Sequence, residues 1–308
     1  MKHLKTSILP TSVRPIGLGI AALLLLLSLH GCKPKQVLST PAVETDKPMR
    51  PVTIQSKAQQ PIRFVLLQIN DVYEISPMDG GKVAGMARVA TVRKQLQASG
   101  NTVITVLSGD YLSPSLLGAL KCDFSGKAER VNGRQMVEVM NAIGVDYLTF
   151  GNHEFDLKLP DLLARNAESR FQIVSANVKL AQDAGGYADF QQNGQPVTDF
   201  MVRRIWNSVG DTLRLGLLGV TLPFNMQPYL KYLDVYESAA TAYNAAQKES
   251  DIVMGITHLS LAEDSMLSLR VPGMPLLMGG HEHVNMLHQV GATRITKADA
   301  NAKTVYLH

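Results

Sequence analysis

Residues 62–73 read IRFVLLQINDVY, an apolar run that ends at once in polar side chains. A continuous apolar run of this length predicts a strand that is buried on both faces, as central strands of parallel sheets are. The same pattern recurs at residues 102–107, 147–150, 252–257 and 275–278. Apolar residues at helical spacing lie between these runs, for example in 83–96 and 159–167. Alternating strands and helices predict an α/β fold with helices packed outside the sheets.

Weaker patterns complete this expectation. Helical spacing predicts further helices over 136–143, 239–249 and 259–269. Short apolar runs predict strands over 173–176 and 303–308, and a hairpin that joins 200–206 to 213–220.

Each of the five buried runs is followed directly by a polar cluster. The clusters contain Asn70-Asp71, Gly109-Asp110, Gly151-Asn152-His153-Glu154, Thr257-His258 and Gly280-His281-Glu282-His283. A single Gly-Asp is most often a turn, and a lone buried His is more often a core residue than a ligand. Five clusters in this order, each at a strand end, predict instead one functional rim of a sheet. Imidazole and carboxylate without thiolate suit borderline-hard divalent metals, and the glycines allow close approach.

Taken in order, these clusters resemble the motifs of the calcineurin-like metallophosphoesterases. The resemblance is closer to the catalytic domain of the exported 5′-nucleotidase and cyclic-nucleotide phosphodiesterase family, and it covers roughly residues 62–298. It implies a two-layer β-sandwich flanked by helices, with a dinuclear metal site at the C-terminal ends of strands.

The resemblance also implies roles for individual residues. Asp71 and His283 would hold a first divalent ion, Asn152, His258 and His281 a second, and Asp110 would bridge them. The ions would be Zn, Mn or Fe. His153 and Asp156 match the family's catalytic pair, in which the histidine stabilises charge on the phosphate or protonates the leaving group. The implied reaction is hydrolysis of phosphate monoesters, 5′-nucleotides foremost, by a hydroxide that bridges the metals.

Two positions depart from the family pattern. Tyr73 stands where the family has a metal-ligating histidine, and Gln68 stands where relatives often carry histidine. A neutral phenol, with a pKa of about 10, is a poorer ligand than imidazole. We therefore expect a first metal site that is weaker or that favours a harder ion such as Mn²⁺ or Fe.

The N-terminus predicts export. Residues 1–31 combine basic residues with an apolar run that is too short for a comfortable membrane span, and Leu29-His30-Gly31-Cys32 resembles a bacterial lipobox. We expect 1–31 to be a lipoprotein-type signal peptide and Cys32 to anchor the protein to a membrane, on the periplasmic or cell-surface side. The alternative is an uncleaved N-terminal anchor. Residues 32–61 are proline-rich without periodicity and predict a flexible tether.

Charge excludes a nucleic-acid polymer as partner. The chain has a formal net charge of +4 at pH 7, but the basic excess lies in the first 61 residues, and residues 62–308 are slightly acidic. A basic face for phosphate backbones is therefore missing from the predicted domain.

The predicted metallophosphoesterase domain, 62–308, ends before the second, nucleoside-binding domain of longer family members. We expect a truncated product, a separate nucleoside-binding chain, or a different mode of substrate recognition. Two alternative functions remain open at this point. One is hydrolysis of cyclic nucleotides or other phosphodiesters, and the other is a catalytically weak or inactive lipoprotein binding module on the same scaffold.

Overall fold

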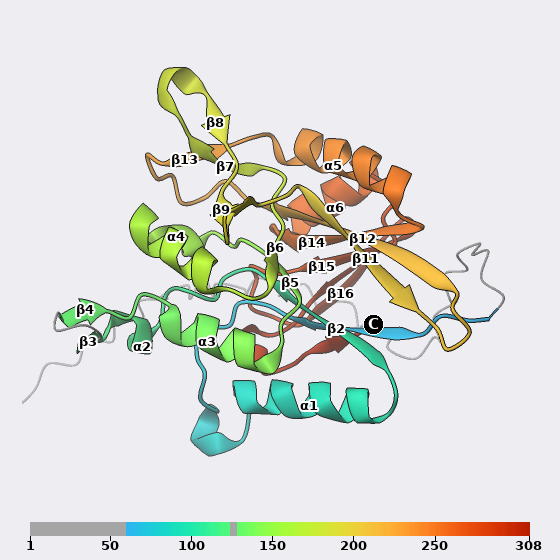
Figure 1. Ribbon diagram of the computed structural model, residues 1–308, viewed down its shortest axis with the longest axis horizontal. Coiled ribbons are helices and arrows are strands. Elements are labelled where there is room, and N and C mark those ends of the chain that lie inside the picture. Colours follow the sequence, from blue (N-terminus) through green and yellow to red (C-terminus); the bar gives the residue numbers. More distant parts are fainter. Residues whose placement is uncertain (1–59, 124–127) are drawn as a thin grey trace, which may run out of the picture. The chain divides into compact units, whose positions relative to one another are not determined.

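The computed structural model describes residues 60–123 and 128–308, so the predicted leader and residues 32–59 of the predicted tether lie outside it. Two β-sheets face each other in the described part (Figure 1). The first has the order β18-β1-β2-β5-β6, with β18 Tyr306–Leu307, β1 Phe64–Ile69, β2 Thr102–Ser108, β5 Tyr147–Thr149 and β6 Gln172–Ile173. The second has the order β11-β12-β14-β15-β17-β16, with β11 Phe200–Trp206, β12 Thr212–Thr221, β14 Ile252–His258, β15 Leu276–Gly279, β17 Thr293–Lys297 and β16 Met286–Val290.

Helices cover the outer faces of both sheets. The first sheet packs against α1 (Met86–Ala98), α3 (Arg134–Ile143) and α4 (Leu159–Glu168), and the second against α5 (Val235–Glu249) and α6 (Leu261–Arg270). This arrangement confirms the predicted two-layer β-sandwich flanked by helices. Smaller elements decorate it: η1 Asp79–Gly81, α2 Leu116–Ala119, β3 Lys121–Asp123, β4 Ala128–Arg130, η2 His153–Asp156, β7 Val178–Ala181, η3 Asp183–Gly185, β8 Tyr187–Ala188, β9 Gln191–Gln192, β10 Gln195–Pro196, β13 Leu230–Tyr232 and η4 Ala300–Ala302.

The interior strands of both sheets run parallel. β1, β2, β5 and β6 pair in parallel, as do β12, β14, β15 and β17, whereas β18, β11 and β16 pair antiparallel at the sheet edges. Parallel strands that are covered on both faces need apolar side chains in both directions. This is why their sequences read as continuous apolar runs.

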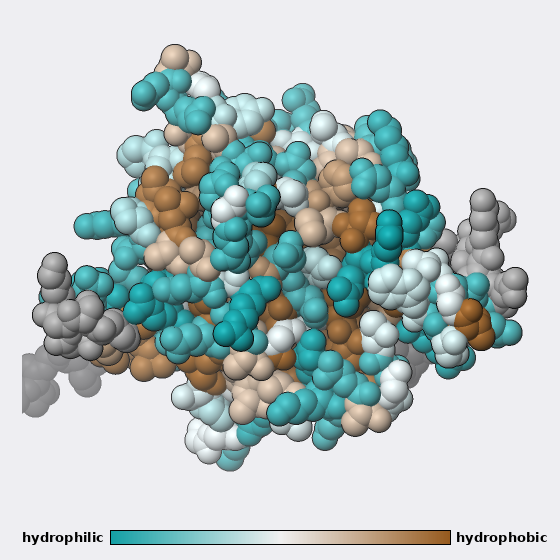
Figure 2. All heavy atoms as spheres, viewed as in Figure 1, coloured by the Kyte–Doolittle hydropathy of each residue, from teal (hydrophilic) through white to brown (hydrophobic). Residues whose placement is uncertain are grey.

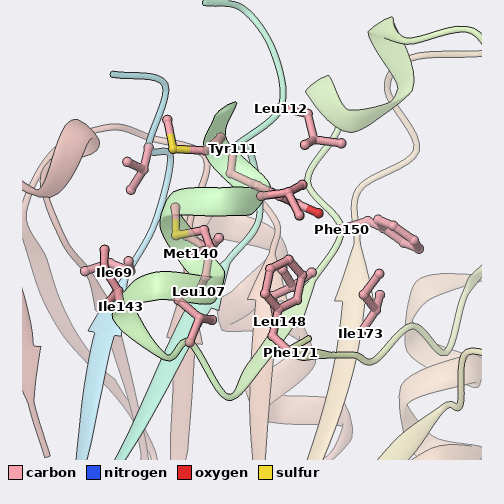
Figure 3. Close-up of a cluster of buried hydrophobic side chains, with 14 of the residues drawn as sticks. Ile69, Leu107, Tyr111, Leu112, Met140, Ile143, Leu148, Phe150, Phe171 and Ile173 are labelled. Carbon is pink, nitrogen blue, oxygen red and sulfur yellow. The ribbon is translucent and has the colours of Figure 1, made fainter. Parts of the chain in front are cut away.

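The core has three apolar layers. The middle layer, between the sheets, contains Leu66 and Val106 from one side and Leu217, Ile256 and Met278 from the other. The second sheet and its helices enclose another layer. The third lies between the first sheet and its helices, where Figure 3 shows Met140 and Ile143 of α3 beside Ile69 and Leu107. Burying each large apolar side chain contributes about 1.5–3 kcal/mol, so these layers fix the strand ends firmly.

The surface of the described part is mixed. Figure 2 shows a largely hydrophilic face, with hydrophobic residues in smaller patches among the polar ones. Among residues 60–123 and 128–308, none of the helices has both the length and the apolar character that a membrane span requires.

Local capping and long-range pairing account for the differences from the expected elements. α5 starts at Val235 rather than 239 because the Asp234 carboxylate accepts hydrogen bonds from the backbone N–H of Tyr236 and Glu237, both 2.9 Å. α6 starts at Leu261 rather than 259, after a capping box made by Ser260 and Glu263. The β16–β17 hairpin was not expected, because β16 is mostly exposed and its residues lack a clear apolar pattern.

Candidate metal centre

The predicted ligands lie together where strands of both sheets end. Asp71, Asp110 and Asn152 follow β1, β2 and β5, His258 ends β14, and His281 and His283 follow β15. The residue pattern predicted one sheet edge, whereas the structure combines the edges of two facing sheets. A hydrogen bond crosses between them, from Nδ1 of His258 to the carbonyl oxygen of Ser108 at 2.7 Å.

Two glycines permit this close approach, as the sequence predicted. A Cβ on Gly151 would lie 2.0 Å from Oδ1 of Asp110, and one on Gly280 would lie 2.3 Å from the Ser108 carbonyl oxygen. Both distances are far inside van der Waals contact. Any side chain at either position would therefore push the ligand loops apart.

A first group of donors consists of Asp71, Asp110 and His283. One ligand atom from each lies within 4.8 Å of the others, and Nε2 of His283 is 3.1 Å from Oδ1 of Asp71. The second oxygen of Asp71 accepts hydrogen bonds from Asn70 Nδ2 at 2.8 Å and from the His281 backbone N–H at 2.9 Å. Oδ1 is thus the oxygen that faces the group. Two carboxylates and an imidazole at this spacing fit a divalent ion.

A second group forms around His258, which is completely buried. Its Nε2 lies 3.2 Å from Oδ1 of Asn152 and 3.3 Å from Oδ2 of Asp110. The ring of His281 packs edge-on against the His258 ring, with centroids 5.5 Å apart. Because Nδ1 of His258 is held by a carbonyl oxygen, Nε2 is the nitrogen that can ligate a metal. Asp110 touches both groups, as a bridging ligand must.

Asp110 and His258 form a buried pair, with Oδ2 and Nε2 3.3 Å apart. Burial alone lowers the pKa of His258, but the Asp110 carboxylate outweighs it and raises that pKa to about 10. Burial raises the pKa of Asp110, and the charge of His258 reverses this and lowers it to about 2. The carboxylate is therefore ionised and ready to accept a cation, while His258 must release a proton before it can ligate.

Tyr73 lies inside the first group. Its neutral hydroxyl donates a hydrogen bond there. Its hydroxyl is 2.8 Å from Oδ2 of Asp110, to which it donates, and 3.1 Å from Nε2 of His283. Burial, then the Asp110 and Asp71 carboxylates, raise the pKa of this phenol far above its usual value. A neutral phenol therefore stands where the family has a ligating histidine, and the weakness of the first site stays a prediction.

Gln68, the other position that departs from the family pattern, lies outside the candidate metal centre. Its side-chain amide donates to the carbonyl oxygens of Thr296, at 2.8 Å, and Gly279, at 3.2 Å, and its Oε1 accepts from the Thr296 hydroxyl at 2.7 Å. These bonds tie β1 to β17 and β15. Gln68 is therefore a cross-sheet structural residue and not a ligand.

The predicted catalytic pair sits beside these groups on η2. Nδ1 of His153 is 2.8 Å from Oδ2 of Asp156, and both side chains are about one third exposed. The backbone N–H of His153 donates to Oδ1 of Asp110 at 2.8 Å, which fixes the pair next to the Asp110 carboxylate. With Nδ1 engaged, Nε2 is the ring nitrogen available to a substrate.

Three further residues, Glu154, Ser113 and Asn225, support the site, although the sequence analysis gave none of them a role. Glu154 is completely buried and accepts hydrogen bonds from the backbone N–H groups of Asp110, Tyr111, Leu112 and Gly151, at 2.6–3.1 Å. Asp156 accepts from Asn225 Nδ2 at 2.6 Å and from the Ser113 hydroxyl at 3.0 Å. Glu154 stands within the quoted Gly151–Glu154 cluster, but Asn225 follows no motif that could have revealed it.

Comparison with known proteins identifies the family. The model of the calcineurin-like phosphoesterases matches residues 64–285, most of the described part of the chain. The chain belongs to the calcineurin-like phosphoesterase family. The family resemblance predicted from the five clusters is thus confirmed.

Its similar proteins are mostly 5′-nucleotidases. A snake venom 5′-nucleotidase of Gloydius brevicauda is 28% identical over 246 residues, which cover 73% of this chain and 38% of the relative. A bovine 5′-nucleotidase is 26% identical over 253 residues, with 73% and 39% covered. The crystal structure of a 5′-nucleotidase precursor from Thermus thermophilus superposes with a TM-score of 0.65 at 23% identity, covering 79% of this chain and 50% of that one. This chain spans about two fifths of the curated relatives that it matches.

A calcineurin-like phosphoesterase fold implies divalent metal ions, and the residues present fit them. The two donor groups supply carboxylate, imidazole and amide oxygen, and Asp110 contacts both. This donor chemistry excludes neither Zn²⁺ nor Mn²⁺ nor Fe.

The proton on His258 predicts that metal binding at this centre depends on pH. Ligation requires the neutral imidazole, and the pKa of His258 is raised to about 10. Below that pH an ion must displace the proton, so affinity should rise with pH, about tenfold per unit for one released proton. Calorimetric titration with Mn²⁺ in buffers of different ionisation heat counts the protons. His288→Ala, on exposed β16, is the matched control and should release as many as the wild type. Metal binding without proton release at pH 7 would contradict the coupling.

Tyr73 variants test the character of the first site. Tyr73→Phe should leave metal content and turnover nearly unchanged, because a hydrogen-bond donor and not a ligand is lost. Tyr73→His should tighten the first site and shift preference toward softer ions, because neutral imidazole is a good ligand for Zn²⁺. Metal titration of the three proteins, with hydrolysis followed in parallel, makes the comparison. If Tyr73→Phe loses most of its metal, the phenol is itself a ligand.

Proposed function

We propose that this chain hydrolyses phosphate monoesters, with 5′-nucleotides as the foremost substrates, using two divalent ions held at the candidate metal centre. The observation that carries the proposal is the position of Asp110. Its carboxylate belongs to the first donor group, lies 3.3 Å from Nε2 of His258 in the second, and accepts from the backbone N–H of His153 in the catalytic pair. The 5′-nucleotidase names of the similar proteins support the choice of substrate.

In the proposed reaction the ions and the protein have separate tasks. When bound, divalent ions neutralise phosphate charge and lower the pKa of a water nucleophile. In the proposed arrangement, Asp71, His283 and Asp110 form one ligand set, and Asn152, His258, His281 and Asp110 form the other. Glu154 fixes the loop that carries Asp110 through its backbone hydrogen bonds.

The catalytic pair acts on the phosphate and the leaving group. Asp156 holds Nδ1 of His153, and Asn225 and Ser113 hold Asp156 in turn. The imidazole is thereby oriented with Nε2 free to hydrogen-bond a phosphoryl oxygen or to give a proton to the departing alkoxide.

Hydrolysis assays with two variants test this function. We expect phosphate release from 5′-AMP and p-nitrophenyl phosphate in the presence of Mn²⁺ or Zn²⁺, and none after chelation. Asp110→Ala should lose both ions and all activity, because the shared carboxylate that offsets the charge of two neighbouring cations is gone. His153→Asn should keep its metal while turnover falls by about 10²–10⁴-fold.

Other outcomes would contradict the assignment. An Asp110→Ala protein that still binds two ions per chain would refute the bridging role, and loss of metal from His153→Asn would make that residue a ligand. Faster cleavage of bis(p-nitrophenyl) phosphate or a cyclic nucleotide would establish a phosphodiesterase. Metal binding without any hydrolysis would favour the inactive binding module.

We further propose that the protein is exported and anchored to a membrane by a lipid on Cys32. The described chain begins beside the β11–β12 turn, where the backbone N–H of Gln60 donates to the Asp211 carboxylate at 2.9 Å. From this end β1 and β12 run toward the metal centre. Gln60 therefore lies at the end of the domain away from the metal centre. The support for the anchor itself is the lipobox-like Leu29-His30-Gly31-Cys32.

Detergent partitioning tests the anchor. The wild-type protein should enter the detergent phase of a phase-separating detergent, and Cys32→Ser should remain aqueous. Cys122→Ser removes the other cysteine and should partition like the wild type. A Cys32→Ser protein that stays in the membrane with its leader attached would show an uncleaved N-terminal anchor instead.

A further inference from the structure

Behind the metal centre lies a buried lysine, Lys297, at the end of β17. Its side chain is completely buried, and Nζ is 2.9 Å from both Oδ2 of Asp264 and the carbonyl oxygen of Gly280. It also contacts the Glu282 carboxylate and the Leu259 carbonyl oxygen. An ammonium group is retained in such a place only when several partners compensate for its lost hydration.

The partners of Lys297 belong to the segments that carry the second ligand set. Leu259 directly follows His258, and Gly280 directly precedes His281. Asp264 extends the connection, because its Oδ1 accepts a hydrogen bond from the hydroxyl of Thr257 at 2.6 Å. One ammonium group thereby joins the end of β14, the start of α6 and the turn after β15.

Glu282 stands between the two histidines of that turn. Its carboxylate points inward, to Lys297 and to the backbone N–H of Leu261. The histidines on either side have positive φ, 86° for His281 and 60° for His283. Non-glycine residues in this region are strained, and the conformation persists only where the surrounding structure over-determines it. The Lys297–Glu282 contact supplies such a constraint at the centre of the turn.

We propose that Lys297 is a positioning residue that, through Glu282 and Gly280, holds His281 and His283 in their metal-binding conformation. The proposal rests on the ligand assignment of the proposed function. A positioning effect of Lys297 can be distinguished from an effect of its charge, because the two would change metal affinity in opposite directions. Removing a positive charge near bound cations would tighten their binding, whereas releasing the turn weakens it.

The decisive variant is Lys297→Met, which keeps an unbranched side chain only one atom shorter and removes the ammonium group. We expect the dissociation constant for Mn²⁺, measured by equilibrium dialysis, to rise about 10–100-fold, the usual effect of losing a group that orients ligands. Activity lost at low Mn²⁺ should return at saturating Mn²⁺. Dialysis is independent of turnover, so it reports on the turn itself.

Lys179 provides a matched control. It is also buried and paired with two carboxylates, Asp189 at 2.7 Å and Asp199 at 2.6 Å, but it lies on β7, outside the metal centre. Lys179→Met should lower the thermal midpoint in the same way and leave Mn²⁺ affinity unchanged. Equal weakening by both variants would make the effect of Lys297 one of general stability and overturn the proposal.

Glu282→Asp gives a second, milder test that decides the matter where Lys297→Met fails to fold. It keeps the negative charge but shortens the side chain by one methylene, so the contact with Lys297 is broken. We expect the Mn²⁺ dissociation constant to rise about tenfold, at the lower end of the usual effect of such orienting groups. An affinity equal to the wild type would overturn the proposal. A wild-type protein that neither binds metal nor hydrolyses esters would instead refute the proposed function, which the same dialysis series reveals first.

Discussion

The Asp110 carboxylate is the contact on which the arrangement of the site depends. It is almost completely buried, accepts hydrogen bonds from the Tyr73 hydroxyl and the His153 backbone, and pairs with His258. These partners come from the loop after β1, from η2 and from β14. One side chain therefore connects three strand ends and both sheets. Such a buried charge is tolerated only because each oxygen is satisfied, and the same satisfaction makes it suited to hold cations.

The backbone is strained at Asp110 and at other residues around it. Asp71, Asp110, His281 and His283 all have positive φ, between 51° and 86°. Two of the three loops involved have a buried ionisable side chain behind them. Glu154 receives the backbone N–H groups of the Asp110 loop, and Lys297 contacts carbonyl and carboxylate oxygens of the turn after β15. The Glu154 carboxyl group thus accepts from buried backbone donors of one loop, and the Lys297 ammonium group donates to buried acceptors of the other. These bonds fix backbone conformations that isolated loops would not keep.

The two departures from the family pattern have separate consequences. Gln68 lies between the sheets, where its side-chain amide donates hydrogen bonds to carbonyl oxygens of β15 and β17. Tyr73 remains in the site and donates to the carboxylate that the proposed ions share. A neutral phenol leaves the charge on Asp110 and adds no charge of its own. The first donor group is therefore the part of the centre in which this chain differs most from its family.

Local sequence patterns were enough to predict the elements whose signal comes from neighbouring residues. Apolar runs predicted the parallel strands β1, β2, β5, β14 and β15, and the polar clusters that follow them predicted the site region, because a strand buried on both faces must be apolar and must end where polarity begins. The predicted strand at 173–176 is shorter, as β6 pairs only over Gln172–Ile173. Only the tertiary structure decided that two sheet edges meet, that Asn225 holds Asp156, and that Glu154 and Lys297 face inward. Burial, protonation and hydrogen-bond partners are set by residues distant in the chain, so no local pattern encodes them.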